Sequence, residues 1–421
     1  MVPFLALLVA ACAAAPNVTF HRDIAPILQA NCQECHRAGE IGKFPLMTYQ
    51  EARPWAAAMK QATLSKKMPP WFADEHYGKF ANHRALTPDE IGKIAAWADS
   101  GAAEGSLKDA PAPKKFTAGW NIPAPDTVLT VARPFPVPAK GKIDYQYLVV
   151  PTGFTEDKWI QMAEVRPSER SVVHHVVVLI RTPGAAGGGQ DRAAEGAGAF
   201  GSVLTIYTPG MVPDILPAGQ AKLVKAGSSL VFQMHYTANG TATEDSTKIG
   251  LVFAKEPPRE RVITVAATNR GFRIPPGDAA HEVRSEFRLP VESKLVSLFP
   301  HMHLRGKDFE YHAVSAAGER QTLLKVPRYD FNWQLSYRTA DQPLLAAGSR
   351  IECVAHFDNS PNNAHNPDAS VEVRWGPQSW EEMMIGFLDV AVDLHKYPNY
   401  RGDLSKREVS AASVPETPRP Q

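Results

Sequence analysis

Apolar and polar positions follow two different patterns along this chain of 421 residues. In the N-terminal part, residues 23–30 are predicted to form a first helix. Thr87-Pro88-Asp89-Glu90 opens a last one, because it joins an N-cap Thr to an early Pro and an acidic residue three positions on. Further along, short runs of β-branched and aromatic residues alternate with Pro and Gly, which is typical of strands. The pattern predicts a multidomain protein, with a small all-α domain followed by an all-β region.

The all-β region is long enough for two sandwich domains of jelly-roll-like type. Residues 106–118, which contain Pro, Ala and Lys, are predicted to be the linker before them. A double proline near residue 257 marks the boundary between them, so we predict β domains over residues 119–257 and 258–400. The predicted strands include residues 147–150, 172–180, 230–236, 248–253, 294–299, 309–314 and 384–392.

Both ends of the chain are predicted to lie outside these domains. An apolar run over residues 4–15 is too short to cross a bilayer, so residues 1–15 are predicted to be a signal peptide or a lipoprotein leader. The tetrapeptide ending in Cys12 resembles a bacterial lipobox, in which Cys12 would carry a lipid anchor, and ordinary cleavage nearby is the alternative. Either outcome predicts export to the periplasm or cell envelope without a membrane span. Residues 401–421 are polar and Pro-rich, which predicts a disordered tail.

Composition narrows the choice of partners and of cross-links. The formal net charge is +1, with 45 basic and 44 acidic residues, so nothing predicts binding to nucleic acid or to an anionic membrane. The chain has four cysteines, of which Cys12 falls in the leader. If Cys32 and Cys35 bind a cofactor, only Cys353 remains and no disulfide can form.

The motif Cys32-Gln33-Glu34-Cys35-His36 is the pattern for covalent attachment of a c-type haem. Each thiol can bond one vinyl group of the porphyrin, while His36 binds the iron. A structural disulfide would leave the histidine unexplained. A zinc site would need a second ligand pair at matching spacing, which this region lacks. We therefore predict a c-type cytochrome domain over residues 18–105 with one covalent haem.

Haem iron in such domains usually has a second axial ligand, commonly a methionine further along the chain. Met68 lies in a loop stiffened by the two prolines that follow it. Met47 and Met59 are the competitors, although Met59 lies in a helical run and fits a core position better. Met68 is the predicted axial ligand.

Histidines cluster on the predicted strands of the all-β region. His301 and His303 share one strand face and form a ready chelate. His174 and His175 are neighbours, so both can bind one metal only at a strand end or a bulge. His235 is the fifth histidine of this group. One buried histidine with a polar partner would be ordinary in a core, but five buried histidines would each need such a partner, which makes a purely structural role a poor explanation. Imidazoles together with a thioether from the Glu382-Met383-Met384 segment favour copper, including Cu(I).

These motifs occur in the same order as in the copper type II, ascorbate-dependent monooxygenases, which include the peptidylglycine α-hydroxylating and dopamine β-monooxygenases. The resemblance covers about residues 120–398. It implies two β-sandwich domains that face each other across a solvent-filled cleft, each with one copper. By motif match, the electron-transferring copper would be bound by His174, His175 and His235, and the oxygen-activating copper by His301, His303 and Met383. Met384 is the rival ligand to Met383.

The chain also departs from the resembling animal enzymes. Those are rich in disulfides, and here the position that would pair with Cys353 is occupied by Met384. Phe299 stands two residues before the His-x-His motif, where the peptide enzyme has an Arg that helps to bind the peptide carboxylate. The resemblance therefore implies copper chemistry for this chain, but it does not imply a peptide substrate.

The resulting functional prediction is a haem–copper monooxygenase that hydroxylates a C–H bond of a small-molecule substrate with O2. Electrons would pass from an external donor (a cytochrome, a quinol-linked protein or an ascorbate-like reductant) to the haem. They would then pass to the electron-transferring copper and the oxygen-activating copper. The alternatives are an extracytoplasmic electron-transfer or copper-binding protein without hydroxylase activity, and a cytochrome whose β region only binds a partner.

Overall fold

The computed structural model describes residues 18–116, 119–184 and 202–398. The predicted leader with Cys12 and the predicted tail lie outside the described residues. No described helix is both long and apolar enough to cross a membrane. The chain is mostly β-sheet with few helices, as the sequence predicts.

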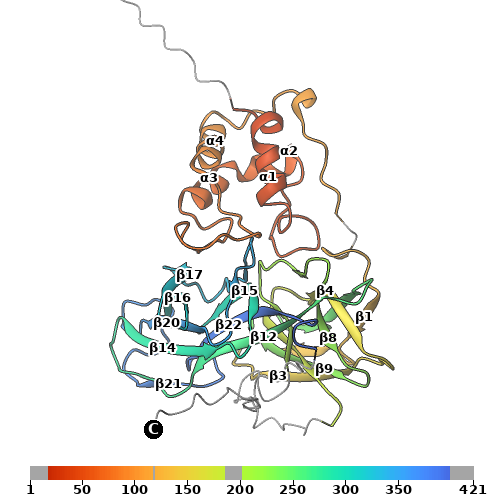
Figure 1. The fold of residues 1–421 in the computed structure, drawn as a ribbon. Helices are drawn as coiled ribbons and strands as arrows, with labels where there is room; N and C mark the ends of the chain where they lie inside the picture. The colour runs from red at the N-terminus through yellow and green to blue at the C-terminus, as the bar shows by residue number, and fades with distance from the viewer. Residues whose placement is uncertain (1–17, 117–118, 185–201, 399–421) are drawn as a thin grey trace, which may run out of the picture. The chain divides into compact units, whose positions relative to one another are not determined.

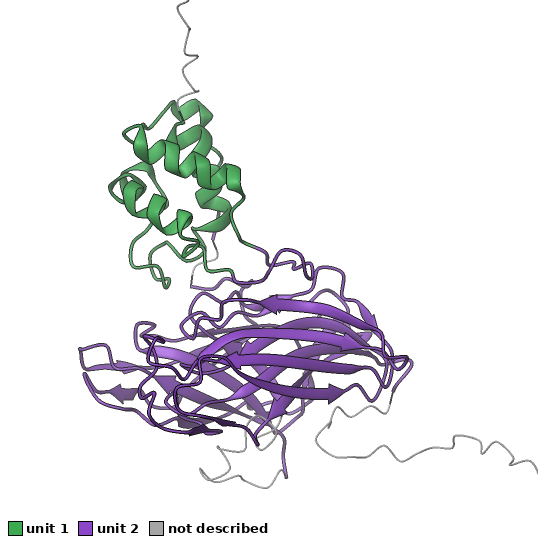
Figure 2. Cartoon of the chain, turned by 90° about the vertical axis from the view of Figure 1, so that its left-hand side faces the viewer, with its two compact units in different colours: residues 1–71, 84–115 green, residues 72–83, 116–421 purple. Residues whose placement is uncertain are grey.

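The described chain forms two compact units, coloured separately in Figure 2. The helical unit contains the described residues up to Trp71 together with Arg84–Lys115. The β unit contains Phe72–His83 and the described residues from Phe116 onward. The chain therefore leaves the helical unit after Trp71, enters the β unit for twelve residues and returns, a division that the sequence pattern did not predict.

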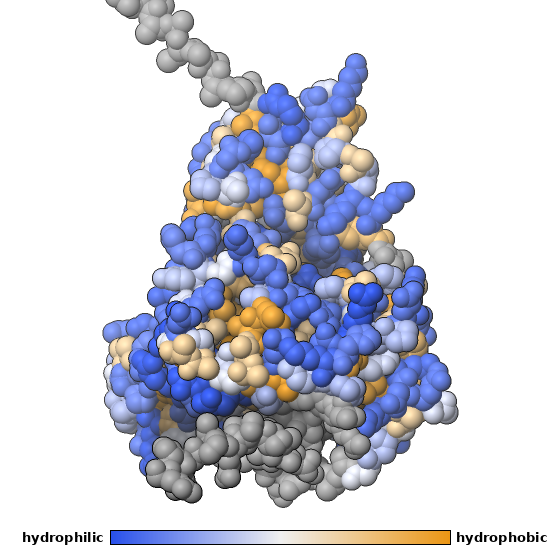
Figure 3. All heavy atoms as spheres, in the orientation of Figure 1, coloured by the Kyte–Doolittle hydropathy of each residue, from blue (hydrophilic) through white to orange (hydrophobic). Residues whose placement is uncertain are grey.

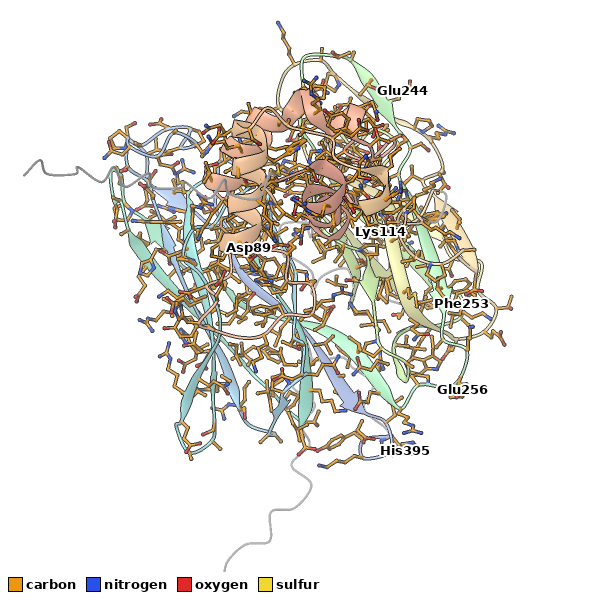
Figure 4. The ribbon with its side chains drawn as sticks, turned by 90° about the horizontal axis from the view of Figure 1, so that it is seen from above. Asp89, Lys114, Glu244, Phe253, Glu256 and His395 are labelled. Carbon is orange, nitrogen blue, oxygen red and sulfur yellow. The ribbon has the colours of Figure 1, made fainter. Side chains whose placement is uncertain are left out.

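The helical unit packs short helices around Phe20, Ile24 and Trp97, which are buried. The predicted start of the last helix is present, because Thr87 accepts a hydrogen bond from the Glu90 amide and Glu90 accepts one from the Thr87 amide. Figure 4 labels Asp89 in the first turn of this helix. The helical segments are the π-turn Phe20–Ile24, α1 (Ala25–Asn31), α2 (Tyr49–Ala52), the 3-10 turn Arg53–Trp55, α3 (Ala56–Leu64), α4 (Pro88–Asp99) and the 3-10 turn Leu107–Asp109.

The β unit contains the strands of the described chain, which form one ten-stranded sheet, two four-stranded sheets and two two-stranded sheets, β10-β2 and β13-β21. The strands are β1 (Thr127–Thr130), β2 (Phe135–Val137), β3 (Gln146–Pro151), β4 (Lys158–Arg166), β5 (Val173–Arg181), β6 (Ser202–Tyr207), β7 (Asp214–Ile215), β8 (Gln220–Val224), β9 (Ser229–Tyr236), β10 (Thr243–Asp245), β11 (Lys248–Phe253), β12 (Glu260–Asn269), β13 (Arg273–Ile274), β14 (His281–Arg288), β15 (Ser293–His301), β16 (Gly306–Val314), β17 (Arg320–Val326), β18 (Tyr337–Arg338), β19 (Leu344–Leu345), β20 (Arg350–Phe357), β21 (Val373–Arg374) and β22 (Met384–Asp393).

The long sheet has ten strands and runs through both predicted β domains. Its main path is β1-β11-β4-β8-β12-β22-β15-β18, and the two halves meet where β8 pairs in parallel with β12. The sheet β3-β9-β5-β6 belongs to the first half, and β14-β20-β16-β17 belongs to the second. In Figure 1, β12 and β22 lie between the strands of the two halves.

The predicted boundary near residue 257 falls between β11 and β12, where Figure 4 labels Glu256 at the outside of the unit. At this point the structure differs from the arrangement that the resemblance implies. Instead of a solvent-filled cleft, a continuous sheet joins the halves, and Leu216 of the first half packs against Val262, Val296 and Ala391 of the second. Backbone pairing and apolar burial together hold the halves in contact.

Phe72–His83, which we call the strap, is fastened to the second half of the β unit. Phe80 forms a β-bridge with Thr339, and the Ala81 amide donates to the Arg338 carbonyl. Asn82 donates to the Ser336 carbonyl at 2.8 Å and accepts from the Arg338 amide at 2.9 Å. The strap therefore extends the sheet beside β18, directly after the Met68 loop in sequence.

The surface seen in Figure 3 is mainly hydrophilic, with smaller apolar patches between polar regions. Exposed large apolar side chains come from separate elements, among them Val128 of β1, Ile215 of β7 and Leu344 of β19. Scattered apolar residues of this kind are ordinary on a folded surface, so they do not indicate a functional site.

Candidate metal centre

The first three candidate ligands lie on the neighbouring strands β5 and β9. The pairing register shifts between Val173 and His175, which is the irregularity that two adjacent histidines need to face one site. The Nδ1 atoms of His174 and His175 are 3.1 Å apart, and the ring centroids of His175 and His235 are 4.9 Å apart. One ligand atom from each of the three lies within 4.8 Å of the others, which is close enough to share a metal ion.

His301 and His303 lie at the end of β15, with ring centroids 5.3 Å apart. His301 donates from Nδ1 to Gln334 Oε1 at 2.6 Å, and His303 donates from Nδ1 to the Glu381 carbonyl at 3.2 Å. With Nδ1 occupied in both rings, Nε2 is the nitrogen that remains for a metal.

The two histidine sets meet in one group, which we call the histidine cluster: His174, His175, His235, His301 and His303. The ring centroids of His175 and His301 are only 5.9 Å apart. Phe331 joins the sets a second time, because its ring stacks on His174 at 4.2 Å and meets the edge of His303 at 6.2 Å. The halves of the β unit thus bring the five imidazoles into one chain of ring contacts.

Met383 and Met384 have different surroundings. Ile385 pairs with His301 across the sheet, so Met383, two residues before Ile385, shares the face of His301. Met383 packs with Phe299 and Phe387, whose ring centroids are 6.5 and 6.3 Å from that of His301. Met384 is buried on the opposite face, where its sulfur accepts a hydrogen bond from Ser285 Oγ at 3.0 Å. This geometry favours Met383 as the thioether ligand.

Burial keeps the histidine cluster neutral. Burial, with a smaller contribution from the neighbouring His301, lowers the pKa of His235 to about 4, and burial lowers the pKa of His301 to about 4. Burial also lowers the pKa values of His174, His175 and His303. All five rings therefore offer lone pairs at neutral pH. Within the described chain, His235 Nδ1 and His303 Nε2 are buried without a hydrogen-bond partner. Buried orphan nitrogens beside other neutral imidazoles fit a bound metal.

Several side chains that hold the ligands were not identified from the sequence. Tyr145 is hydrogen-bonded through its hydroxyl to His175 Nε2 at 3.1 Å, and its ring stacks on His235 at 4.8 Å. Gln334 fixes His301, and its own carbonyl accepts a hydrogen bond from Thr208 of the first half. Phe331, Gln334 and Tyr145 lie in loops without a motif, so no sequence signal could have found them.

Glu382 and Arg305 form a buried hydrogen-bond network next to the second ligand set. Glu382 is fully buried and accepts hydrogen bonds from the amides of His303 at 2.8 Å and Arg305 at 2.6 Å. Arg305 donates from Nε to Asn359 at 2.9 Å and from Nη1 to the Trp380 carbonyl at 2.8 Å. Burial raises the pKa of Glu382 to about 8, against the lowering effect of these amides and of the guanidinium. The network fixes the backbone that leads into Met383 and the backbone around His303.

In the helical unit, the geometry around the CxxCH motif fits haem attachment. Cys32 and Cys35 are free thiols rather than a disulfide. His36 donates from Nδ1 to the Phe44 carbonyl at 3.0 Å, which leaves Nε2 for an axial bond. A Cβ at Gly42 would lie 2.5 Å from the Cys35 carbonyl and 2.8 Å from His36 Nδ1, so only glycine fits this close approach.

The three methionines considered as the other axial ligand lie in different settings. Met59 is buried in α3 within the apolar core, as its helical pattern suggested. The Met47 amide donates to Glu51 at the start of α2. Met68 is partly buried in the loop after α3, where its amide donates to the Ala62 carbonyl. Only Met68 lies in a loop that directly follows a helix end, so it stays the predicted ligand.

We expect the metal-free protein to lose stability as the pH falls from about 6.5 toward 4. The pKa values of His235 and His301 are about 4 in the folded chain, so between those limits the unfolded chain binds more protons. Each tenfold difference in proton affinity between the folded and unfolded chain corresponds to about 1.4 kcal/mol, so the loss should be on the order of several kcal/mol. Urea unfolding at stepped pH measures it.

The control for this experiment is His235→Leu, which should lose less stability over the same pH range because one titrating ring is gone. An unchanged free energy of unfolding of the parent protein between pH 6.5 and 4 would contradict the neutral, buried state of the cluster.

Comparisons with known proteins leave the family of this chain open. No family model and no curated protein matches it. Similar solved structures include the major capsid protein P2 from bacteriophage PM2, at 10% identity and TM-score 0.30, with 63% of this chain and 97% of the other covered. PNGF-II matches at 10% identity and TM-score 0.31, over 63% and 65%. Allantoicase matches at 8% identity and TM-score 0.18, over 53% and 79%. Similarity this low carries no argument about function, which therefore depends on the geometry of the site.

Proposed function

We propose that this protein is an exported haem–copper monooxygenase that hydroxylates a C–H bond of a small organic substrate with O2. The observation that carries the proposal is the histidine cluster, in which five neutral imidazoles come together from two sandwich halves, with Met383 packed on the phenylalanines that contact His301. Neutral imidazoles with one thioether suit copper in both oxidation states.

Each half contributes one ligand set. His174, His175 and His235 would hold one copper. His175 would bind through Nδ1, because Tyr145 occupies its Nε2, and His235 would bind through Nδ1, which has no hydrogen-bond partner among the described residues. His301 and His303 would hold the other through Nε2, together with the Met383 sulfur. Bound copper would supply the one-electron and O2 chemistry that hydroxylation of an unactivated C–H bond needs.

The residues around Met383 would exclude water from the reaction. Phe299, Ile385 and Phe387 pack on Met383, and Met211 of the first half packs against the same group. An apolar lining favours an apolar reacting carbon and limits the loss of reducing equivalents to solvent. Phe299 also supplies no charge for a substrate carboxylate, which agrees with a substrate other than a peptide.

The helical unit would provide the electron entry. Cys32 and Cys35 would bond the haem, and His36 and Met68 would be its axial ligands. His36 is already oriented by the Phe44 carbonyl. The product and water together require two electrons and two protons besides the substrate and O2, so an external donor must reduce the haem in each turnover.

The test combines metal analysis with product detection. Protein matured with haem and copper should contain two coppers per haem, and should consume O2 in a fixed ratio to hydroxylated product. A protein with two coppers that reduces O2 without hydroxylating any candidate substrate would favour the electron-transfer alternative. A protein without copper would leave a cytochrome whose β unit binds a partner.

Replacing each of the two neighbouring methionines in turn with leucine gives a matched test of which thioether binds copper. Met383→Leu should abolish the Cu–S scattering in X-ray absorption of the reduced protein and weaken Cu(I) binding more than Cu(II) binding, because the soft sulfur prefers Cu(I). Met384→Leu is the control, because this sulfur faces Ser285 in the sandwich core. Loss of the Cu–S signal in the control variant, and not in Met383→Leu, would reverse the assignment.

A further inference from the structure

The contact between the two histidine sets is at odds with two separate copper centres. His175 and His301 come from different halves, yet their rings are 5.9 Å apart at the centroids and nearly perpendicular, at 86°. His174 and His303 both contact Phe331. Such contacts require that the halves be held together at this point.

A buried ionic group joins the halves beside the cluster. Lys222 on β8 is 5% exposed and donates from Nζ to the Leu204 carbonyl at 2.9 Å and to Thr264 Oγ1 at 3.0 Å. Its ion-pair partner is Asp389 on β22, at 3.2 Å. Asp389 also accepts hydrogen bonds from Thr264 and from Ser297. We call Lys222, Thr264, Ser297 and Asp389 the interlock.

The interlock spans both halves in sequence as well as in space. Lys222 and Leu204 belong to the first half, whereas Thr264, Ser297 and Asp389 belong to strands β12, β15 and β22 of the second. A buried lysine needs a compensating charge. Lys222 interacts with Asp214 of its own half and with Asp389 of the second half, and the second partner is in reach only when the halves are in contact. Separation would take the lysine away from Asp389, so the interlock favours the closed arrangement.

The interlock and the histidine cluster share a wall. A cavity of about 30 Å³ is lined by Lys222 and Asp389 together with Phe299 and Phe387. The same two phenylalanines pack on Met383 and face the ring of His301. A change in the interlock therefore reaches the second ligand set through a single layer of aromatic rings.

A chain of hydrogen bonds also connects the first half to His301 through Gln334. Thr208 of the first half donates to the Gln334 carbonyl, and Gln334 in turn accepts from His301 Nδ1. Gln220 of β8 also donates to Glu260 at 2.7 Å and to Gln342 at 2.6 Å in the second half. The halves are thus fixed together around the cluster rather than at one point.

We propose that the two ligand sets form one closed binuclear copper centre, held shut by the Lys222–Asp389 interlock, in which the two Cu(II) spins are magnetically coupled. The inference rests on the proposed function, because it assumes that both sets bind copper. It differs from the open cleft with isolated coppers that the resemblance implies. Substrate and O2 would then meet both metals in one pocket.

Electron paramagnetic resonance of the full-length protein loaded with Cu(II) tests this directly. We expect dipolar broadening, a half-field transition and an integrated intensity below that of two isolated Cu(II) ions. Two superimposed, unbroadened spectra at full intensity would overturn the closed centre while leaving two-copper binding intact. Binding of fewer than two coppers would instead count against the proposed function, so the two failures are distinguishable.

Variants test the role of the interlock. Lys222→Met combined with Asp389→Asn removes both charges of the ion pair. Burial already raises the pKa of the neighbouring Asp214, and loss of Lys222 removes an interaction that lowers it. We expect this double variant to keep two coppers but lose the half-field transition and recover full Cu(II) intensity. Lys325→Met is the control, because its ion pair with Glu310 lies on the surface within the second half. Unchanged coupling in the double variant would overturn the role of the interlock.

If this variant fails to fold, Lys222→Gln is the second test, because its side chain can still donate hydrogen bonds. It should show a partial loss of coupling, and full coupling would overturn the role of the interlock in the same way.

Discussion

Replacing Arg305 with methionine is expected to destabilise the β unit by about 3–5 kcal/mol, because it removes one charge from a buried network. Arg305 is 1% exposed and carries hydrogen bonds to Asn359 and to the Trp380 carbonyl. Its charge also lowers the pKa of the buried Glu382 carboxyl, which accepts hydrogen bonds from the amides of His303 and Arg305. Without the guanidinium, these acceptors stay buried and lose their partner.

Urea unfolding monitored by tryptophan fluorescence measures this loss. The matched control is Arg320→Met, because Arg320 is 44% exposed on its side chain and is paired with Glu352 across 3.4 Å. An exposed pair of this kind should contribute about 1 kcal/mol or less. Equal stability losses in the two variants would show that the Arg305 network does not support the fold, and copper affinity would then be expected to stay unchanged as well.

Local chemistry made part of the fold and of the site predictable. The capping box at Thr87 and Glu90 depends on residues three positions apart, so a single sequence reveals it. The need for a bulge at His174-His175 follows from strand alternation, and the register shift in β5 supplies it. The choice of Met383 over Met384 also agrees with alternation, since the two sulfurs face opposite sides of β22.

Long-range pairing was not predictable in the same way. The parallel contact of β8 with β12 depends on which edges meet in space, and neither strand carries a signal for it. The resemblance implied a solvent-filled cleft between the halves, and no local pattern in the sequence points to the interlock of Lys222 with Asp389, which are 167 positions apart. Gln334 and Tyr145 touch the ligands from loops, where polar residues are too common to single out.

The strap shows how domain boundaries can mislead when they are inferred from composition. Residues 18–105 have a sequence pattern typical of one helical domain, and the haem motif within them favoured that interpretation. Yet Phe72–His83 forms its hydrogen bonds with Ser336, Arg338 and other residues of the β unit. A short extended segment gains stability from whichever sheet edge it can reach, and its own sequence does not specify that edge.

The remaining prediction concerns the haem, and it has the largest expected spectroscopic effect. The sulfur of Met68 lies in the loop between α3 and the strap, whereas Met59 is in the apolar core and the Met47 amide is tied to Glu51. A ligand must reach the iron without dismantling its own helix, which disfavours Met59. His36 would keep its bond to iron in any Met68 variant, because the Phe44 carbonyl orients it independently.

Met68→Ala should therefore abolish the methionine–iron charge-transfer band completely, while the haem stays covalently bound through Cys32 and Cys35. Absorption spectra of the oxidised protein record the band, and retention of haem after acid–acetone extraction records the attachment. Met47→Ala is the matched control, since it removes a half-buried methionine of the same unit and should leave the band unchanged. If the band persists in Met68→Ala and disappears in Met47→Ala, the axial ligand is Met47. The loop that leads into the strap would then have no role in haem ligation.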